Sequence, residues 1–200
     1  MKFISLIIIV LLTACQASNK KSEENNQNPN HETQNTIPNK EERNWNEELT
    51  QAALNGDFSI VKQALNNGTS VKTKNENGNT PLMLAAYNGH TKIVQLLIDN
   101  GANVNVKDNN GRTALMFASS GPFAETVSLL LKKGANTNEV DNVEGFTALM
   151  FAASEGNSDV VRVLLKNGAD KSILDVDKES AYDFAISNQH PETAKIINNF

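Results

Sequence analysis

The sequence contains very few of the residue types that carry metal or thiol chemistry. Its 200 residues include one cysteine, Cys15, and three histidines, His31, His90 and His190. A lone cysteine cannot form a disulfide within the chain. No two histidines stand at the spacing of zinc ligands, and no cysteine or carboxylate cluster accompanies them. We therefore expect no metal site and no cofactor.

Basic charge is also scarce. Lys and Arg total 18 against 23 Asp and Glu, so the formal net charge is -5 and the isoelectric point lies near 5.2. Nucleic-acid-binding proteins carry clustered Lys and Arg that pair with phosphates, and no such cluster occurs here. Nucleic acid is therefore not an expected partner, and a polybasic membrane patch is absent from the sequence as well.

The only long apolar run is at the N-terminus. Residues 3–12 are apolar except for one serine and follow Lys2. The run is too short to span a bilayer and is typical of a signal-peptide core. It ends in a four-residue motif, Leu12-Thr13-Ala14-Cys15. This motif resembles the lipobox of bacterial lipoproteins.

That resemblance implies that residues 1–14 are a signal peptide and that Cys15 becomes the lipidated N-terminus. Two alternatives remain open: an ordinary signal peptide cleaved after Ala14, and an uncleaved membrane anchor. Lipidation would hold the protein on the membrane, since two or more acyl chains anchor stably whereas one is marginal. Gln16 follows the cysteine in place of Asp. By similarity to the sorting pattern of enterobacterial lipoproteins, this favours the outer membrane facing the periplasm.

Residues 15–44 have the composition of a tether. From residue 16 to residue 44 there are eight Asn, three Gln and only two apolar residues, Ala17 and Ile37. Such a segment cannot bury enough apolar surface to offset the entropy lost on ordering. We expect a disordered, Asn-rich linker between the lipid and the folded part of the chain.

The rest of the chain repeats with a period of 33 or 34 residues. The segment Thr80-Pro81-Leu82-Met83-Leu84-Ala85-Ala86 recurs from Thr113 and again from Thr147. A period of this length indicates small units that stack on one another. Within one unit, Thr80 is a good helix N-cap and Pro81 suits the first helical position. Gly89 breaks this helix, and a second amphipathic helix follows as far as the next glycine, Gly101.

These units resemble the ankyrin repeat. The matching segments are residues 78–86, 89–90, 93–97 and 101–105. The resemblance covers about residues 45–200 and implies an all-α repeat fold, an ankyrin solenoid of helix–loop–helix units with β-hairpin-like loops. We expect about three full repeats over 79–178, with degraded terminal units at 45–78 and 179–200 serving as caps.

One register of the repeat departs from the family pattern. Met83, Met116 and Met150 stand where the ankyrin pattern usually has His. We expect these flexible side chains to fill gaps between units, and the hydrogen bonds that the histidine provides are put in doubt. His90 and His190 occupy a second histidine position of the family, which implies a structural role for both.

No catalytic constellation can be assembled from the sequence. Ser and Asp residues fall in loops or helix caps, with no glycine-bounded nucleophile elbow and no phosphate-cradling loop. The acidic pair Asp175 and Asp177 favours a solvated loop over a general acid/base pair. The prediction is a protein that is not an enzyme and has no small-molecule substrate.

The ankyrin resemblance implies that partners bind the loop tips and the exposed side of the first helix. Carried onto this sequence, the predicted partner-binding residues are Glu76, Asn77, Asn79, Tyr87, Asn88, Asn109, Asn110, Arg112, Ser120, Asn142, Val143, Glu144, Phe146, Ser154 and Glu155. Tyr87, Arg112 and Phe146 are of the types that concentrate binding energy. For Phe146, exposure as an anchor and packing of the longer third loop are both open. Packing is the expectation for Phe123.

Together these features predict a non-catalytic, monomeric protein-binding module, tethered to a bacterial membrane through Cys15 and acting in the cell envelope. The alternative is an inhibitor or immunity protein that occludes an envelope enzyme or toxin. Residues 45–200 carry 13 Lys and Arg against 18 Asp and Glu, which is compatible with either function. A hydrolase would need titratable residues that converge in one cleft.

Overall fold

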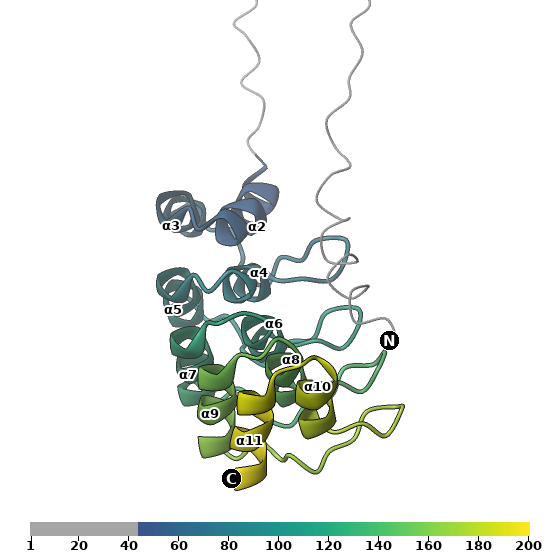
Figure 1. The fold of residues 1–200 in the computed structure, drawn as a ribbon. Helices are drawn as coiled ribbons and strands as arrows, with labels where there is room; N and C mark the ends of the chain where they lie inside the picture. Colours follow the sequence, from purple (N-terminus) through teal and green to yellow (C-terminus); the bar gives the residue numbers. More distant parts are fainter. Residues whose placement is uncertain (1–43) are drawn as a thin grey trace, which may run out of the picture. The chain divides into compact units, whose positions relative to one another are not determined.

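The computed structural model describes residues 44–200 (Figure 1). The predicted signal peptide, the predicted lipidation site Cys15 and nearly all of the predicted tether lie outside these residues and stay predictions. The described part consists of ten helices and contains no strand. This confirms the expected all-α fold.

The helices pair along the chain into five units, which we number one to five. The first helices of the units are α2 (Trp45–Asn55), α4 (Pro81–Tyr87), α6 (Ala114–Ser119), α8 (Ala148–Ser154) and α10 (Ala181–Ser187). The second helices are α3 (Phe58–Asn66), α5 (Thr91–Asp99), α7 (Ala124–Lys132), α9 (Ser158–Lys166) and α11 (Pro191–Asn199). Figure 1 shows the first helices in one column, the second helices in a parallel column, and the connecting loops projecting from the stack.

A capping box starts each first helix from α4 onward. In α4, Thr80 Oγ1 accepts a hydrogen bond from the Met83 N–H at 3.3 Å, and the Thr80 N–H donates to Met83 Sδ at 3.4 Å. The same pair of bonds joins Thr113 to Met116 and Thr147 to Met150. The methionines are buried as expected, and their sulfur atoms in addition satisfy an N-terminal N–H that would otherwise lack a partner.

Neighbouring first helices pack on one another through two buried positions, of which the second carries small side chains. Two positions one helical turn apart are almost fully buried in units two to four; their residues are Leu82, Leu115 and Leu149 at the first position, and Ala86, Ser119 and Ala153 at the second. In unit five the equivalent residues are Tyr182 and Ile186, and both are exposed. No element among residues 44–200 covers this face of α10.

Rings from one unit close over glycines of the unit before it. A Cβ on Gly56 would lie 2.6 Å from His90 Cε1, and a Cβ on Gly89 would overlap the Phe123 ring. His90 Nε2 also lies 3.0 Å from the Leu54 carbonyl oxygen. The structural role expected for His90 and the packing role expected for Phe123 are therefore confirmed.

The loops between units form short hairpins, which we number one to four, at residues 69–79, 102–112, 135–146 and 169–179. Each is closed by a backbone hydrogen bond, such as Asp108 N to Arg112 O at 3.0 Å. One further bond joins each hairpin to the next: Asn109 N to Asn77 O, Asn142 N to Asn110 O, and Val176 N to Glu144 O. The hairpins therefore form a ladder along one edge of the stack.

Candidate protein interface on the hairpins and first helices

Side-chain oxygens shape the hairpin turns that carry the predicted interface. Asp108 Oδ1 accepts hydrogen bonds from the N–H groups of Asn110 and Arg112 at 2.9 and 2.8 Å. Equivalent oxygens come from Asn75, Asp141 and Asp175. Because these side-chain oxygens hydrogen-bond to backbone N–H groups of their own turns, they hold the variable residues around them in fixed positions on the surface.

Most of the predicted partner-binding residues are exposed or half-buried, and nothing in the structure tests whether they bind. The exposed ones are Glu76, Asn77, Asn88, Asn109, Asn110, Asn142, Val143 and Glu155. The half-buried ones are Tyr87, Arg112, Ser120, Glu144 and Ser154. Two of the predicted residues, Asn79 and Phe146, are buried.

Several of these residues also hold the stack together. Asn109 Nδ2 donates to the Glu76 carbonyl oxygen at 3.0 Å, and Asn88 Nδ2 donates to the Leu54 carbonyl oxygen at 2.7 Å. Both bonds join adjacent units. Substitution of either asparagine would therefore change stability as well as any binding, which makes them poor probes of the interface.

Phe146 is the clearest correction to the sequence-based expectation. Its side chain is only 8% exposed, so the interpretation of Phe146 as an exposed anchor is wrong. The ring meets Phe151 edge-on at a centroid distance of 5.5 Å and Phe184 at 4.9 Å. Aromatic side chains in such contacts bury large areas and favour these tilted geometries. Phe146 packs hairpin three onto units four and five.

Asn79 is the second correction. It stands at the position equivalent to Phe146, at the end of hairpin one, and is 8% exposed. Its N–H donates to Asn75 Oδ1 at 2.9 Å, while its own Oδ1 is buried and has no partner among the described residues. A partner could reach this side chain only after the surrounding atoms move.

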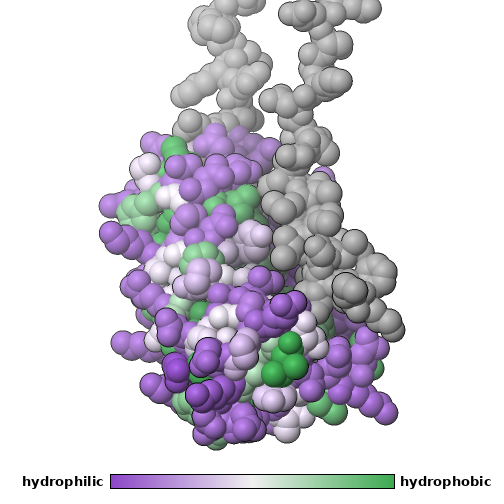
Figure 2. Space-filling model, viewed as in Figure 1, coloured by the Kyte–Doolittle hydropathy of each residue, from purple (hydrophilic) through white to green (hydrophobic). Residues whose placement is uncertain are grey.

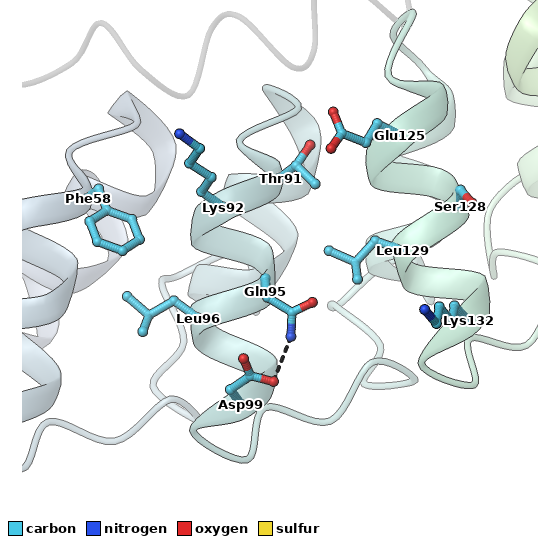
Figure 3. A pocket seen from close by; sticks show the side chains of 10 residues that line it. All are labelled: Phe58, Thr91, Lys92, Gln95, Leu96, Asp99, Glu125, Ser128, Leu129 and Lys132. Atoms are coloured by element: carbon cyan, nitrogen blue, oxygen red, sulfur yellow. Dashed lines mark hydrogen bonds between the residues drawn. The ribbon is translucent and has the colours of Figure 1, made fainter.

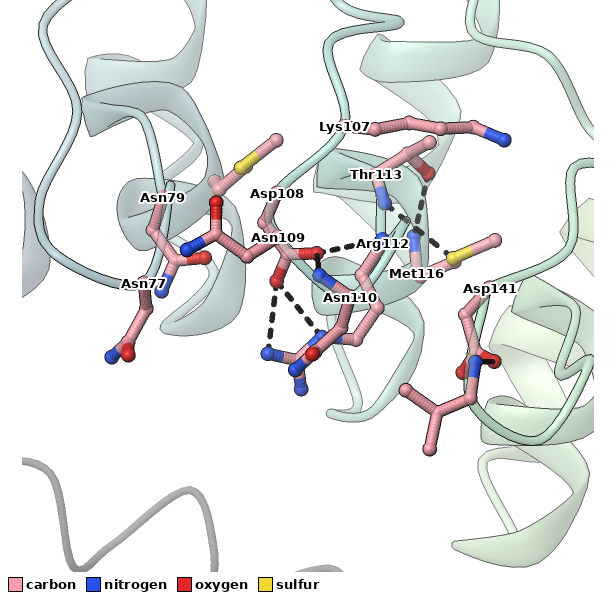
Figure 4. A network of polar contacts seen from close by, with 12 residues as sticks. Asn77, Asn79, Lys107, Asp108, Asn109, Asn110, Arg112, Thr113, Met116 and Asp141 are labelled. Carbon is pink, nitrogen blue, oxygen red and sulfur yellow. Dashed lines mark hydrogen bonds and ion pairs between the residues drawn. The ribbon is translucent and has the colours of Figure 1, made fainter.

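Tyr87, Arg112 and Phe117 form one cluster that spans units two and three. The Arg112 side chain donates from Nε and Nη2 to Asp108 Oδ2, each at 2.9 Å (Figure 4). Its guanidinium carbon lies 4.8 Å from the centre of the Phe117 ring, and Tyr87 meets that ring at 6.1 Å and 89°. The cation is thus fixed by a carboxylate and by a ring face. It presents an ordered polar and aromatic surface.

An ion pair between Lys107 and Glu139 joins hairpin two to hairpin three. Lys107 Nζ lies 2.7 Å from Glu139 Oε2. The hydrogen bond from Lys107, followed by one from Asn136, lowers the pKa of Glu139 below its usual value. Both side chains are partly open to solvent, so the pair contributes little to stability.

A groove on the second helices is a feature that the sequence did not indicate. It has a volume of about 680 Å³ and is lined by residues of α3, α5 and α7, namely Phe58, Thr91, Lys92, Gln95, Leu96, Asp99, Glu125, Ser128, Leu129 and Lys132 (Figure 3). The one available signal is Phe58, an apolar residue that begins α3. The equivalent helices α5 and α9 begin with the polar residues Thr91 and Ser158.

The polar groups of this groove do not converge on a common point. Asp99 accepts hydrogen bonds from Gln95 at 2.6 Å and from Lys133 at 3.3 Å, and these bonds lower its pKa, the Gln95 bond most. Two basic and two acidic side chains line the groove, so its charge is balanced. Nothing in this arrangement indicates a reaction or a ligand class.

Over residues 44–200, no group of three or more His, Cys, Asp or Glu side chains could hold a metal ion. None of the helices in this range is long and apolar enough to cross a membrane. His190, like His90, lies against a glycine of the preceding unit, here Gly156. The histidines of the described region are thus packing residues.

Comparison with known families identifies the fold. The model of the family described as ankyrin repeats (3 copies) matches residues 49–141 and 123–199. The chain belongs to the ankyrin-repeat family. No curated protein matches it in a sequence comparison. Ankyrin repeats are generally protein–protein interaction modules, and proteins built from them are usually non-catalytic. For this ankyrin-repeat chain, a protein partner is therefore the supported class of ligand.

Proposed function

We propose that this chain is a non-catalytic protein-binding module, held at a bacterial membrane by a lipid on Cys15 and acting in the cell envelope. The family supports the binding function. The apolar run at residues 3–12 and the Leu12-Thr13-Ala14-Cys15 motif support the anchor. The Asn-rich residues 16–44 would keep the repeats away from the lipid surface.

The observation that carries the proposal is the ordered surface of the hairpins and first helices. Arg112 is fixed by Asp108 and Phe117, and Tyr87 stands beside them half-buried. Pre-ordered aromatic and arginine side chains lose little entropy on binding and are enriched in the energetic centres of interfaces. A protein partner that docks on units two and three would use this cluster.

Two measurements test the proposal. Cross-linking and affinity capture from the native envelope should recover a specific protein, and Tyr87→Ala should weaken its recovery. The variant Cys15→Ala should move the protein from the membrane fraction to the soluble fraction. Retention of Cys15→Ala in membranes would contradict lipid anchoring, and the absence of any specific partner would contradict the binding function.

A second function, an inhibitor or immunity protein, is favoured by the distribution of charge. Residues 113–200 contain 7 Lys and Arg against 12 Asp and Glu, whereas residues 45–112 contain 6 of each. An acidic surface of this kind is suited to covering a cationic active site. The captured partner should then be an enzyme or toxin whose activity falls when this chain is added, and a toxin-like reading frame should lie beside the gene.

A further inference from the structure

One column of equivalent hairpin residues changes character along the stack. The side chains at this position are Lys74, Lys107, Val140 and Leu174 in hairpins one to four. Val140 is 39% exposed and Leu174 51% exposed. Two apolar side chains on adjacent hairpins therefore stand in solvent where the first two hairpins carry lysine.

The turns of hairpins three and four add two more apolar side chains. Val143 is 56% exposed and Val176 is 62% exposed. The Val176 N–H donates to the Glu144 carbonyl oxygen at 3.0 Å, which places Val176 beside the turn that carries Val143. Six of the eight exposed large apolar residues of the described chain lie between residues 140 and 186. Figure 2 shows apolar side chains on the lower part of the stack, near the position of α10 in Figure 1.

Carboxylates outnumber basic side chains in this half of the chain. Residues 113–200 have a net charge of -5, from 7 basic and 12 acidic residues, and residues 45–112 have a net charge of zero. Around the last two turns, Glu144, Asp177 and Glu179 have no ion-pair partner within residues 44–200. Hairpin four has two basic residues, Lys171 and Lys178, and only Lys178 lies in its turn. The surface is therefore both apolar and acidic.

The hairpin ladder has an open position at its end. In each earlier step, a backbone N–H of one hairpin bonds to the turn carbonyl of the hairpin before it, as Asn109 N does to Asn77 O. The equivalent carbonyl in hairpin four is that of Asp177. No N–H group of the described chain bonds to it. A backbone N–H of a bound segment could continue the ladder there, as main-chain hydrogen bonds do in the recognition of extended peptides.

We propose that hairpins three and four bind an extended segment of another protein in which basic and apolar residues alternate. Its backbone would continue the ladder at the Asp177 carbonyl, and its apolar side chains would contact Val140, Leu174 and Val176. Its Lys or Arg side chains would pair with Glu144 and Asp177. This inference rests on the proposed function and specifies the chemistry of the partner.

A second copy of this chain does not fit the surface. Contact between two C-terminal halves would bring together two segments that each carry a net charge of -5. In a head-to-tail contact, the exposed polar residues Asn46, Glu47 and Gln51 of α2 would face the uncovered apolar residues of α10. The first arrangement opposes like charges, and the second sets polar residues against apolar ones. A basic and apolar segment matches both the carboxylates and the apolar side chains, so it is the occupant that fits.

Binding of labelled peptides to the purified full chain tests the proposal. The probe is a fluorescein-labelled 12-residue peptide of alternating Leu and Lys, followed by fluorescence anisotropy at two salt concentrations. A Leu/Glu peptide and a Lys/Ser peptide of equal length serve as controls. We expect the Leu/Lys peptide to bind at least about ten-fold more tightly than either control, and more weakly at high salt.

Paired substitutions locate the site. Leu174→Ser with Val176→Ser should weaken binding of the Leu/Lys peptide about ten-fold, and Glu144→Gln with Asp177→Asn about three-fold. The matched control substitutes the same two hairpin positions in hairpin one, Lys74→Ser with Glu76→Ser, and should leave affinity unchanged. All the altered side chains are exposed or half-buried, so circular dichroism melts of the two C-terminal pairs should coincide with those of the parent chain. The control pair removes one exposed bond, from Lys74 Nζ to the Lys107 carbonyl oxygen at 3.1 Å, and its melt should shift only slightly.

Three outcomes would overturn the inference. They are equal binding of the Leu/Lys and Leu/Glu peptides, equal losses from the hairpin-one and hairpin-four pairs, and a dimer in sedimentation that the Leu174/Val176 pair abolishes. The last result would assign the surface to a second copy. Envelope capture separates this inference from the proposed function: a partner whose recovery is unaffected by both C-terminal pairs contradicts only the inference. Site-specific peptide binding without any captured partner contradicts only the proposed function.

Discussion

Phe146, the last residue of hairpin three, meets Phe184 of α10 edge-on, with ring centroids 4.9 Å apart and planes at 70°. Phe184 belongs to unit five, whereas hairpin three leads into unit four. The contact therefore joins the hairpin to the following two units, since Phe146 also touches Phe151 of α8. An aromatic residue at a position that varies between units has become part of the core.

Phe146→Ala should lower the free energy of unfolding by about 3–5 kcal/mol, because truncation removes a buried ring and leaves a cavity. Urea denaturation followed by circular dichroism measures the change. Phe58→Ala is the matched control, since the Phe58 side chain is 43% exposed, and it should cost less than about 1 kcal/mol. Equal losses from the two variants would contradict the packing role of Phe146.

Ser119→Ala should stabilise the protein by about 1 kcal/mol. The Ser119 hydroxyl is fully buried and has no hydrogen-bond partner among the described residues, and the equivalent residues are Ala86 and Ala153. Removing an unsatisfied buried group recovers its desolvation cost. The melting temperature should rise by about 2–4 °C. Ser120→Ala, which removes a hydroxyl that donates to the Phe117 carbonyl oxygen, should give no increase.

Lys72→Asn should stabilise the contact between units one and two. Asn105 occupies the equivalent position in hairpin two, where its Nδ2 donates to the Gly134 carbonyl oxygen and its Oδ1 accepts from the Asn136 N–H. Asn138 makes the same two bonds to the next unit. An asparagine at position 72 would add such a clamp, contributing about 1 kcal/mol.

Hydrogen exchange in α2 and α3 would detect this clamp, because protection in unit one should increase. Asn105→Ala is the converse control and should reduce stability by about 1 kcal/mol. If Lys72→Asn leaves exchange in unit one unchanged, the asparagine bonds do not determine how firmly adjacent units are joined.

Asp183→Asn should change how stability depends on pH. Asp183 Oδ2 accepts from the Ser180 hydroxyl at 2.6 Å and the Ser180 N–H at 2.8 Å, and these bonds lower the pKa of Asp183. The carboxylate therefore stabilises the fold fully above its unfolded-state pKa of about 4, and this stabilisation is lost as the pH falls through the lower folded-state pKa.

The side chain is exposed, so solvent screening limits this contribution to a fraction of about 1 kcal/mol. Urea midpoints of the parent chain and Asp183→Asn should differ by a constant amount from pH 5 to pH 7 (about one unit or more above the unfolded pKa) and converge below it. A difference that grows as the pH falls would contradict this account of the cap.

Recurring residues made most of the fold predictable. Thr80, Thr113 and Thr147 predict the helix starts, and the glycines that follow predict the breaks, because capping and turn formation depend on a few neighbouring residues. The helices and the family were both predicted from these recurring residues. The sulfur bonds of the capping boxes were not predicted, since methionine at that position suggested only packing.

The state of the non-recurring residues could not be predicted in the same way. The burial of Phe146 depends on Phe151 in unit four and Phe184 in unit five, and no local pattern relates these positions. Arg112 is held by Asp108, four residues away, but its ring contact requires the geometry of α6. The apolar column at Val140 and Leu174 is visible only after the hairpins are aligned by structure.

The turn of hairpin three contains one residue more than its neighbours, yet the stack is undisturbed. Asp141 Oδ1 accepts hydrogen bonds from the N–H groups of Val143, Glu144 and Gly145 at 2.9–3.0 Å, so one carboxylate closes the longer turn. The ladder bond simply moves to the Glu144 carbonyl. Turn length is therefore decoupled from helix packing. A protein engineer could graft a recognition loop at this turn and leave the rest of the scaffold intact.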